Sequence, residues 1–462
     1  MTTITTPSTK VPPLPGRNSP LIFDAARDIQ RKGFLQFLHD EWQRHGDLFR
    51  IRIGPRDMIL AIHPEHVYHI NVGQRDRYDK RESYDIVREL LLGDGVLTAT
   101  GDAWRRQRRL MSPFFTPRGV EQFMPIMIGD AQQFISRWQA RADRGETVEM
   151  LDEMMFVTAS IILRSLFTTE SDEALLELKD DVETMIQFVA TYQNSALKLP
   201  TWVKVGKNAR YHRARRRVHA CIQSVIAQRR ATAVERWPDD LLSRLMLARD
   251  EETGQAVSDA LLRDESITMF FAGHETTART LTFAWYALAR NPEAGARLRA
   301  EIDAVLGDRS PTTEDLKRMP YTLQVIKETL RLYPAAPLYA RDAVQPDVIG
   351  GRRIPAGATV ILSPFLTHRH PDFWENPERF DPERWSPERE AAQHPYAYHP
   401  FAAGQRICLG NTFSLLESHV LLAMLARRFA PALVNPEHQP QLDMAGTLIS
   451  RNGMAMRILR RV

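Results

Sequence analysis

The chain has 462 residues, of which 43% are hydrophobic and 26% charged. This composition is typical of a globular protein with a sizeable core and excludes a largely disordered chain. The 61 basic and 57 acidic residues leave a net charge of +4, which is too small to predict nucleic-acid binding when the sequence contains no nucleic-acid module.

The N-terminal residues are polar and rich in proline, with neither a signal peptide nor an apolar span long enough for a membrane anchor. We expect a flexible tail over residues 1–20 and a single domain over residues 21–462, because no change of composition divides the rest. Cys221 and Cys408 are far apart. They do not suggest a disulfide framework and favour a reducing, cytoplasmic compartment.

Hydrophobic periodicity predicts mainly helices with a little β-structure. Residues 48–53 and 58–62 predict a hairpin, and residues 117–230 are helical almost throughout. Residues 347–354 and 359–362 suggest the hairpins of a minor sheet.

Residues 101–109 open a helix in which Trp104 and Arg108 are four positions apart. Residues at this spacing share one helix face, so the indole N–H and the guanidinium can point at one acceptor. A carboxylate would suit both groups. The alternative interpretation is an anchoring tryptophan beside solvated arginines.

A long helical run, residues 257–290, contains Ala-Gly-His-Glu-Thr-Thr near its middle. Glycine inside a helix costs about 1 kcal/mol relative to alanine, so the interruption needs a reason. A ligand lying against the small Ala272 and Gly273 is one reason, and Glu275 and Thr276 could then deliver protons to it. A tolerated helix defect is the alternative interpretation.

Near the C-terminal end, the stretch from Phe401 to Gly410 reads FAAGQRICLG and precedes an apolar helical run. Cys408 therefore lies at a helix N-terminus, where backbone N–H groups and the helix dipole favour the metal-binding thiolate. Gly404 and Gly410 permit tight turns beside the sulfur, and the planar guanidinium of Arg406 suits a carboxylate. Taken alone, such a cysteine is most often an inert buried thiol.

The pattern Phe-x-x-Gly-x-Arg-x-Cys-x-Gly resembles the haem-binding loop of the cytochrome P450 family, in which a cysteine thiolate holds the haem iron. Trp-x-x-x-Arg, Ala-Gly-x-Glu-Thr-Thr and the Glu-x-x-Arg of Glu328 and Arg331 also match that family, in its order, from about residue 100 onward. The resemblance implies the cytochrome P450 fold, mainly α with a small β-rich region, which agrees with the periodicity.

The resemblance assigns a role to each motif. Cys408 would be the iron ligand, with Phe401 packed near its sulfur, while Glu275 and Thr276 would be catalytic. Arginines at three places would pair with the haem propionates. The implied cofactor-binding residues are Trp104, Arg108, Ala272, Gly273, Arg341, Phe401, Gly404, Arg406, Cys408 and Gly410.

A structural ion network is implied as well. The segment 376–385 contains Pro-Glu-Arg-aromatic twice, and the second copy stands at the family's distance before the cysteine. By the resemblance, Arg384 of this copy joins Glu328 and Arg331. A buried network of this kind must be fully satisfied to be tolerated, so we expect no catalytic role for it.

The function implied is that of a haem-thiolate monooxygenase of the soluble, bacterial kind. With haem b, it would insert one atom of dioxygen into an apolar substrate, by hydroxylation or epoxidation. Electrons would come from a separate ferredoxin, flavodoxin or reductase, because the sequence carries no Gly-rich dinucleotide fingerprint. A peroxide-driven haem enzyme and a non-catalytic haem protein that binds an apolar ligand remain as alternatives.

The substrate is the least specified part of this interpretation. By analogy with the family, the pocket-lining residues are apolar and carry no charged anchor, which suits a fatty acid, terpenoid or steroid-like molecule. They are Leu91, Leu92, Val96, Leu97, Met269, Phe270, Leu338, Leu448 and Ile449. A movable lid would add Met185, Ile186, Phe188 and Val189, although such a stripe is more often plain core.

Overall fold

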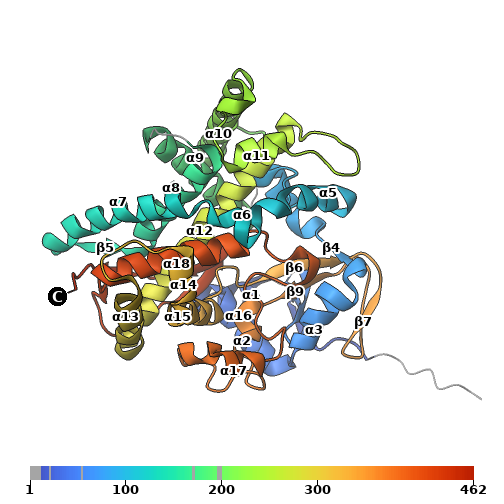
Figure 1. The fold of residues 1–462 in the computed structure, drawn as a ribbon. Coiled ribbons are helices and arrows are strands. Elements are labelled where there is room, and N and C mark those ends of the chain that lie inside the picture. The colour runs from blue at the N-terminus through green and yellow to red at the C-terminus, as the bar shows by residue number, and fades with distance from the viewer. Residues whose placement is uncertain (1–11, 20–21, 54–55, 169–171, 195–199, 462) are drawn as a thin grey trace, which may run out of the picture. The chain divides into compact units, whose positions relative to one another are not determined.

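The computed structural model describes residues 12–19, 22–53, 56–168, 172–194 and 200–461. Helices make up most of the chain and small β-sheets accompany them, which confirms the predicted fold class (Figure 1). The chain forms two compact units. The first comprises residues 1–83, 338–377 and 394–407, and the second comprises residues 84–337, 378–393 and 408–462.

The first unit contains a six-stranded sheet. Its strands are β1 (Gly16–Ser19), β2 (Leu48–Ile53), β3 (Arg56–Ala61), β4 (Tyr78–Asp79), β6 (Tyr339–Ala343) and β9 (Thr359–Leu362). They lie in the order β1-β2-β3-β9-β6-β4, with β2 antiparallel to β3 as the predicted hairpin and β3 parallel to β9. Strand β1 falls within the expected tail, where its pairing with β2 satisfies backbone groups at the edge of the sheet.

Short helices and a second hairpin complete the first unit. They are α1 (Ile22–Lys32), α2 (Phe34–His45), α3 (Pro64–Tyr68), α16 (Pro364–Thr367), β7 (Asp347–Ile349) and β8 (Arg352–Ile354). Apolar residues that alternate along the strands, among them Ile59, Ala61, Val360 and Leu362, pack into one core with Ile354. This alternation is the period of a half-buried sheet.

The second unit is a helical assembly. Its helices are α4 (Asp85–Val87), α5 (Gly101–Met111), α6 (Pro117–Glu121), α7 (Met124–Asp143), α8 (Met150–Phe167), α9 (Asp172–Asn194), α10 (Gly206–Arg230), α11 (Leu241–Leu247), α12 (Asp259–Arg290), α13 (Pro292–Leu306), α14 (Thr313–Lys317), α15 (Pro320–Leu332), α17 (Pro387–Ala391) and α18 (Asn411–Arg428). Two small sheets join them, one of β5 (Thr147–Glu149), β10 (Ala432–Leu433) and β13 (Ala455–Arg457), the other of β11 (Leu442–Ala445) and β12 (Thr447–Ser450).

Helix α12 is the axis of the second unit and confirms the long helical run predicted from the sequence. Its 32 residues begin after Ser258, whose hydroxyl accepts a hydrogen bond from the backbone N–H of Leu261. Helices α8, α15 and α18 pack around it. Most of α12 is buried on every face, so a residue of α12 that stays exposed needs its own explanation.

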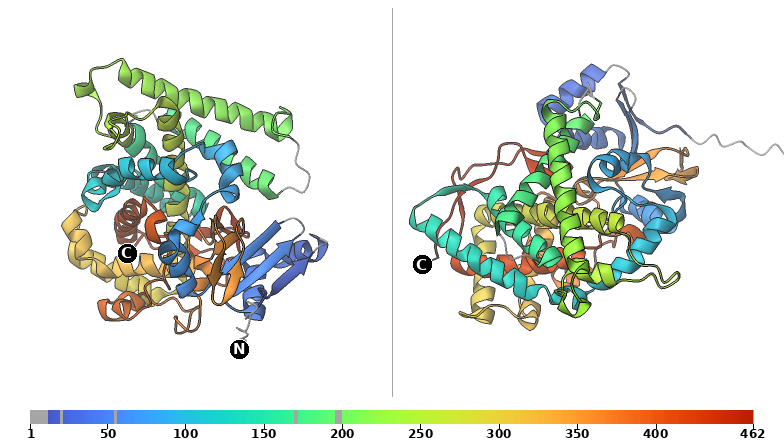
Figure 2. Two further views of the ribbon diagram at one scale, coloured as in Figure 1. Left: turned by 90° about the vertical axis from the view of Figure 1, so that its right-hand side faces the viewer. Right: turned by 90° about the horizontal axis from the view of Figure 1, so that it is seen from above.

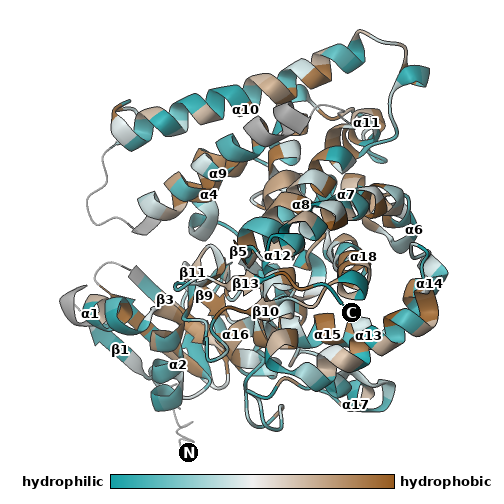
Figure 3. Cartoon of the chain, turned by 90° about the vertical axis from the view of Figure 1, so that its left-hand side faces the viewer, coloured by the Kyte–Doolittle hydropathy of each residue, from teal (hydrophilic) through white to brown (hydrophobic). Residues whose placement is uncertain are grey.

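Helix α10 has the opposite character. It lies beside α9 (Figure 2) and is hydrophilic along much of its length (Figure 3). Arg210, Arg213 and Arg216 are exposed, and Arg217 pairs with Asp181 of α9. No helix within the described ranges is both long and apolar enough to cross a membrane.

Candidate active site

Cys408 lies three residues before α18, so the predicted thiol at a helix N-terminus is confirmed. Its side chain is exposed. Gly404 has a φ of 67°, and a Cβ there would stand 2.1 Å from the carbonyl oxygen of Asn71, so this turn requires glycine. Gly410 differs, because its φ of −85° is open to any residue. Ala402 takes a left-handed φ of 60°, which is strained for alanine.

Two arginines of the first unit that were expected to bind carboxylates have different partners. Arg406 is buried in an ion pair with Asp79 of β4. Arg341 of β6 donates through Nη1 to the carbonyl oxygen of Ala340 at 2.8 Å, and its guanidinium lies 4.9 Å from the centre of the Tyr339 ring. Its Nη2 is buried and has no acceptor among the residues that the structure describes. A buried cationic donor without an acceptor favours a further anionic partner.

Helix α5 of the second unit carries Trp104 and Arg108. Trp104 is buried and Arg108 half-buried. Burial lowers the pKa of Arg108 below its usual value, while the negative charge of a Cys408 thiolate opposes that shift. The guanidinium is therefore near enough to Cys408 for their charges to interact.

The middle of α12 exposes a narrow strip. Ala272, Gly273 and Thr276 are half-exposed, whereas the residues that follow to Leu288 are buried. The Thr276 hydroxyl donates to the carbonyl oxygen of Ala272 at 2.7 Å. Gly273 also has a packing reason, because a Cβ there would stand 2.9 Å from Ile162 of α8. The strip thus has small side chains and one hydroxyl.

Glu275 is buried behind this strip. Its Oε1 accepts from Arg279 Nη2 at 2.7 Å and Nε at 3.1 Å, and from the Thr447 hydroxyl at 2.6 Å. Its Oε2 accepts no hydrogen bond within the described part of the chain. Sequence reasoning missed both partners. The spacing of four positions could have indicated Arg279, but Thr447 is 172 positions away and left no signal.

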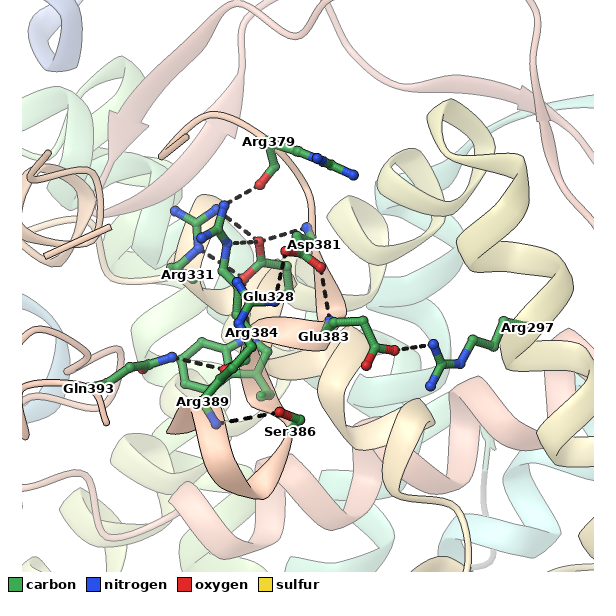
Figure 4. A network of polar contacts seen from close by, with 11 residues as sticks. Arg297, Glu328, Arg331, Arg379, Asp381, Glu383, Arg384, Ser386, Arg389 and Gln393 are labelled. Carbon is green, nitrogen blue, oxygen red and sulfur yellow. Dashed lines mark hydrogen bonds and ion pairs between the residues drawn. The ribbon is translucent and has the colours of Figure 1, made fainter. Parts of the chain in front are cut away.

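The predicted network around Glu328 is confirmed (Figure 4). Arg331 donates through Nε and Nη2 to the two carboxylate oxygens at 2.9 and 2.8 Å, and Arg384 Nε lies 3.4 Å from Oε1. The backbone N–H of Asp381 and the indole of Trp385 donate as well, at 2.9 and 3.1 Å. Every oxygen of this buried carboxylate therefore has donors, as a structural role requires.

The expected lining residues are divided between two environments. Leu91, Leu92, Met269, Phe270 and Leu448 are buried, while Val96, Leu97, Leu338 and Ile449 are half-buried. In the expected lid, Phe188 stacks on Tyr211 of α10 with ring centres 4.3 Å apart. That contact makes Phe188 part of the packing between α9 and α10, which favours the plain-core interpretation for this residue.

The residues present fit an iron porphyrin that carries two carboxylates. In the second unit, Cys408 offers a thiolate ligand beside the Arg108 guanidinium. In the first unit, taken by itself, the buried Nη2 of Arg341 lacks an acceptor among the described residues. The exposed strip of α12 offers small side chains. A soft thiolate and cationic forks are the donor set that haem requires.

Comparison with known proteins agrees with this geometry. A cytochrome P450 family profile matches residues 12–455. Cyclooctatin synthase of Streptomyces melanosporofaciens is 35% identical over 396 residues, which cover 86% of this chain and 85% of the relative. Cyclooctat-9-en-7-ol 5-monooxygenase of the same species is 35% identical over 399 residues, covering 86% and 84%.

Two further similarities extend this agreement. Pentalenene oxygenase of Streptomyces avermitilis is 31% identical over 385 residues, covering 82% of this chain and 83% of the relative. The crystal structure of the cytochrome P450DA heme domain superposes with a TM-score of 0.88 at 29% identity, covering 98% of both chains. The chain thus belongs to the cytochrome P450 family and is one of its haem-dependent monooxygenases, which use dioxygen and a redox partner.

Proposed function

We propose that the chain uses haem b and electrons from a separate protein to insert one oxygen atom into an apolar, terpenoid-like substrate. The observation that carries this proposal is the pair of Glu275 and Thr276 in α12. One oxygen of Glu275 is fixed by Arg279 and Thr447, and the other accepts nothing from the described residues. A carboxyl and a hydroxyl placed together suit proton delivery to dioxygen. An enzyme driven by peroxide does not need this pair.

The protein's own groups divide the work. Cys408 would ligate the iron, and Arg108, Arg341 and Arg406, with the Trp104 indole, would hold the propionates. When bound, haem supplies the redox-active iron at which dioxygen is reduced. Ala272 and Gly273 would leave room beside that iron, while Phe401, Gly404 and Gly410 shape the loop around the sulfur.

Proton handling follows from the hydrogen bonds already present. Because Thr276 gives its hydroxyl proton to the Ala272 carbonyl, its oxygen is left to accept a hydrogen bond from a protonated ligand. The free oxygen of Glu275 can exchange protons while its partner oxygen keeps the side chain in place. Thr276 would then hold the proton, and Glu275 would resupply it.

Relatives support the substrate class. Two of them are named for cyclooctat-9-en-7-ol and pentalenene, and the expected lining of this chain is apolar throughout. Three arginines of α5, the exposed Arg105 and Arg109 and the half-buried Arg106, support docking of an acidic electron carrier. The bacterial relatives support a cytoplasmic location.

The first test is spectroscopic. Reduced protein with carbon monoxide should show the strongly red-shifted Soret band of a thiolate-ligated haem. Cys408→Ala should abolish that band, while Cys221→Ala, which removes the exposed thiol on α10, should leave it intact. A normal thiolate band in Cys408→Ala would end the ligand assignment.

The second test concerns electrons and substrate. A panel of terpenes, fatty acids and steroids is screened for the spectral shift that follows loss of iron-bound water. A compound that produces it is then incubated either with reduced ferredoxin and dioxygen or with hydrogen peroxide alone. Product only with ferredoxin supports the proposal. Product with peroxide alone, or none in either case, supports one of the two alternatives.

A further inference from the structure

The segment between η4 (Arg88–Leu92) and α5, residues 93–98, is attached to α12 through its backbone. The N–H of Asp94 donates to Asp264 Oδ2 at 3.0 Å. Two residues later, the N–H of Val96 donates to both oxygens of Glu265 at 3.0 and 3.1 Å. Two consecutive carboxylates of one helix therefore hold two alternate peptide groups of one loop. We call residues 93–98 the latched loop.

Two glycines show how closely the latched loop approaches the helix. A Cβ at Gly93 would stand 2.2 Å from Asp264 Oδ2, and the φ of Gly93 is 59°. A Cβ at Gly95 would stand 2.2 Å from Thr268 Oγ1 and 3.1 Å from the backbone oxygen of Asp264. A side chain at either position would force the loop, the Asp264 carboxylate or the Thr268 hydroxyl to move, so glycine suits both places.

Holding the latched loop with Glu265 costs stability, because the carboxyl group must be buried. Its side chain is 1% exposed, and no cation pairs with it within the described ranges, because Arg263 pairs with Asp264 instead. Burial raises the pKa of Glu265 to about 8, against the opposing effect of the Val96 hydrogen bond. A carboxyl group buried with one backbone donor lowers the stability of the fold. Stability alone therefore does not explain it, and a role in function does.

The position of Glu265 supplies that role. It precedes Ala272 by seven positions, which is about 10 Å along the helix axis. The latched loop carries Val96 and Leu97, which are half-buried and are expected to face the substrate. The peptide after Asp94 is also held by Gln107 of α5, whose Nε2 donates to the carbonyl oxygen of Asp94 at 2.9 Å. The loop thus connects α5, which carries Arg108, with α12, which carries the oxygen-activation pair.

We infer that Glu265 is a positioning residue that fixes the latched loop and thereby sets which apolar molecules the pocket admits. This inference rests on the proposed function. Glu265 touches neither substrate nor haem in this role, and it acts through the Val96 peptide. Glu265 would select among apolar molecules of different bulk. A displaced loop changes the size of the space beside α12 and does not change the charge of that space.

The test compares Glu265→Leu with Glu265→Gln in haem-loaded protein. Glutamine keeps an oxygen for the Val96 N–H, whereas leucine keeps the volume and removes the acceptor. Amide hydrogen exchange over residues 94–98 should accelerate at least tenfold in Glu265→Leu and less than threefold in Glu265→Gln. Exchange in α18 should not change in either variant. Equal acceleration in both segments, or none in the loop, would overturn the inference.

A binding measurement adds a readout of selectivity. Imidazole needs only the iron, while clotrimazole also needs the pocket, so the ratio of their dissociation constants reports on the space beside it. We expect this ratio to change at least fivefold in Glu265→Leu and to return toward the wild-type ratio in Glu265→Gln. An unchanged ratio with a normal carbon monoxide spectrum contradicts the inference alone. Absence of the thiolate band in wild-type protein contradicts the proposed function.

A second variant reaches the loop from the opposite side if Glu265→Leu yields no holoprotein. Gly95→Ala places a methyl group against Thr268 and should release the loop with the same two signatures. Gly129→Ala is its matched control, because no described atom beyond the adjoining backbone of α7 stands within 4 Å of a Cβ at that position. Equal behaviour of these two alanine variants would also overturn the inference.

Discussion

Two buried carboxylates of the second unit differ in one respect. Glu328 of α15 and Glu275 of α12 each pair with an arginine of their own helix, three or four positions ahead. Both oxygens of Glu328 have donors, whereas Glu275 uses Oε1 alone among the described residues. The spacing between glutamate and arginine is almost the same in the two pairs. What separates a structural carboxylate from one available for chemistry is the donor count on the second oxygen.

The largest expected effect concerns the saturated carboxylate. Arg331→Ala would leave Glu328 buried without its main partner, which should lower the free energy of unfolding by about 3–5 kcal/mol. Urea unfolding of the haem-loaded protein measures this loss. Lys317→Ala, which breaks an exposed pair with Glu314, should leave the free energy of unfolding nearly unchanged. If Arg331→Ala and the wild type had the same midpoint of urea unfolding, the network would not be structural.

A third buried carboxyl group, that of Glu265, has the fewest hydrogen-bond donors of the three. Glu265 has a pKa of about 8 in the folded protein against a usual value of 4.5, so between these pH values the folded state keeps a proton that the unfolded state has lost. Stability should therefore fall as pH rises through this window. Glu265→Gln should remove a slope of about 1.4 kcal/mol per pH unit, or roughly 3 kcal/mol from pH 5 to 7.

The measurement is urea unfolding of wild type and Glu265→Gln at several pH values, with the difference between them plotted against pH. Titrating histidines affect both proteins and cancel in that difference. A flat difference for Glu265→Gln would mean that Glu265 is ionised throughout the window.

The half-used carboxylate should affect dioxygen-dependent turnover. Glu275→Gln should slow dioxygen-dependent turnover by about 100-fold, because an amide cannot exchange protons. Carbon monoxide binding should be preserved. Thr276→Ala should still bind haem and substrate but release more of the reduced oxygen as peroxide. Product formed per electron-donor equivalent, with peroxide assayed alongside, measures both effects. Unchanged ratios in both variants would remove this pair from oxygen activation.

The smallest effect isolates the occupied oxygen of Glu275. Thr447→Val removes one donor to Oε1 and leaves both bonds from Arg279. We expect a loss of about 1 kcal/mol in the free energy of unfolding and turnover within about threefold of wild type. Turnover that falls as far as in Glu275→Gln would show that the donors of Oε1, and not the free oxygen, decide activity.

Local patterns predicted much of this molecule. The helix α12 and the hairpin of β2 and β3 followed from periodicity, and the choice of Arg384 over Arg379 followed from the resemblance to the family. Contacts between distant segments did not. Asp79 pairs with Arg406, 327 positions away, and Thr447 donates to Glu275, 172 positions away. No local preference encodes such pairings.

Glycines show the same limit in a different form. The sequence marked Gly273 as a place for a ligand, and the structure adds Ile162 of α8 as a packing partner. The sequence did not single out Gly93 and Gly95, because the residues that approach them belong to α12, far along the chain. A glycine indicates a close approach, but only the folded chain identifies what approaches it.

The pairing of β3 with β9 has a consequence for synthesis. About 300 residues separate Ala61 from Thr359, so at about 5–20 residues per second the ribosome needs roughly 15–60 s to supply the partner strand. During that interval the apolar strand Met58–Ala61 has no partner on that side. An unpaired edge of this kind can join another chain. The yield of folded protein in a cell should therefore depend on chaperones that cover β3 until translation passes β9.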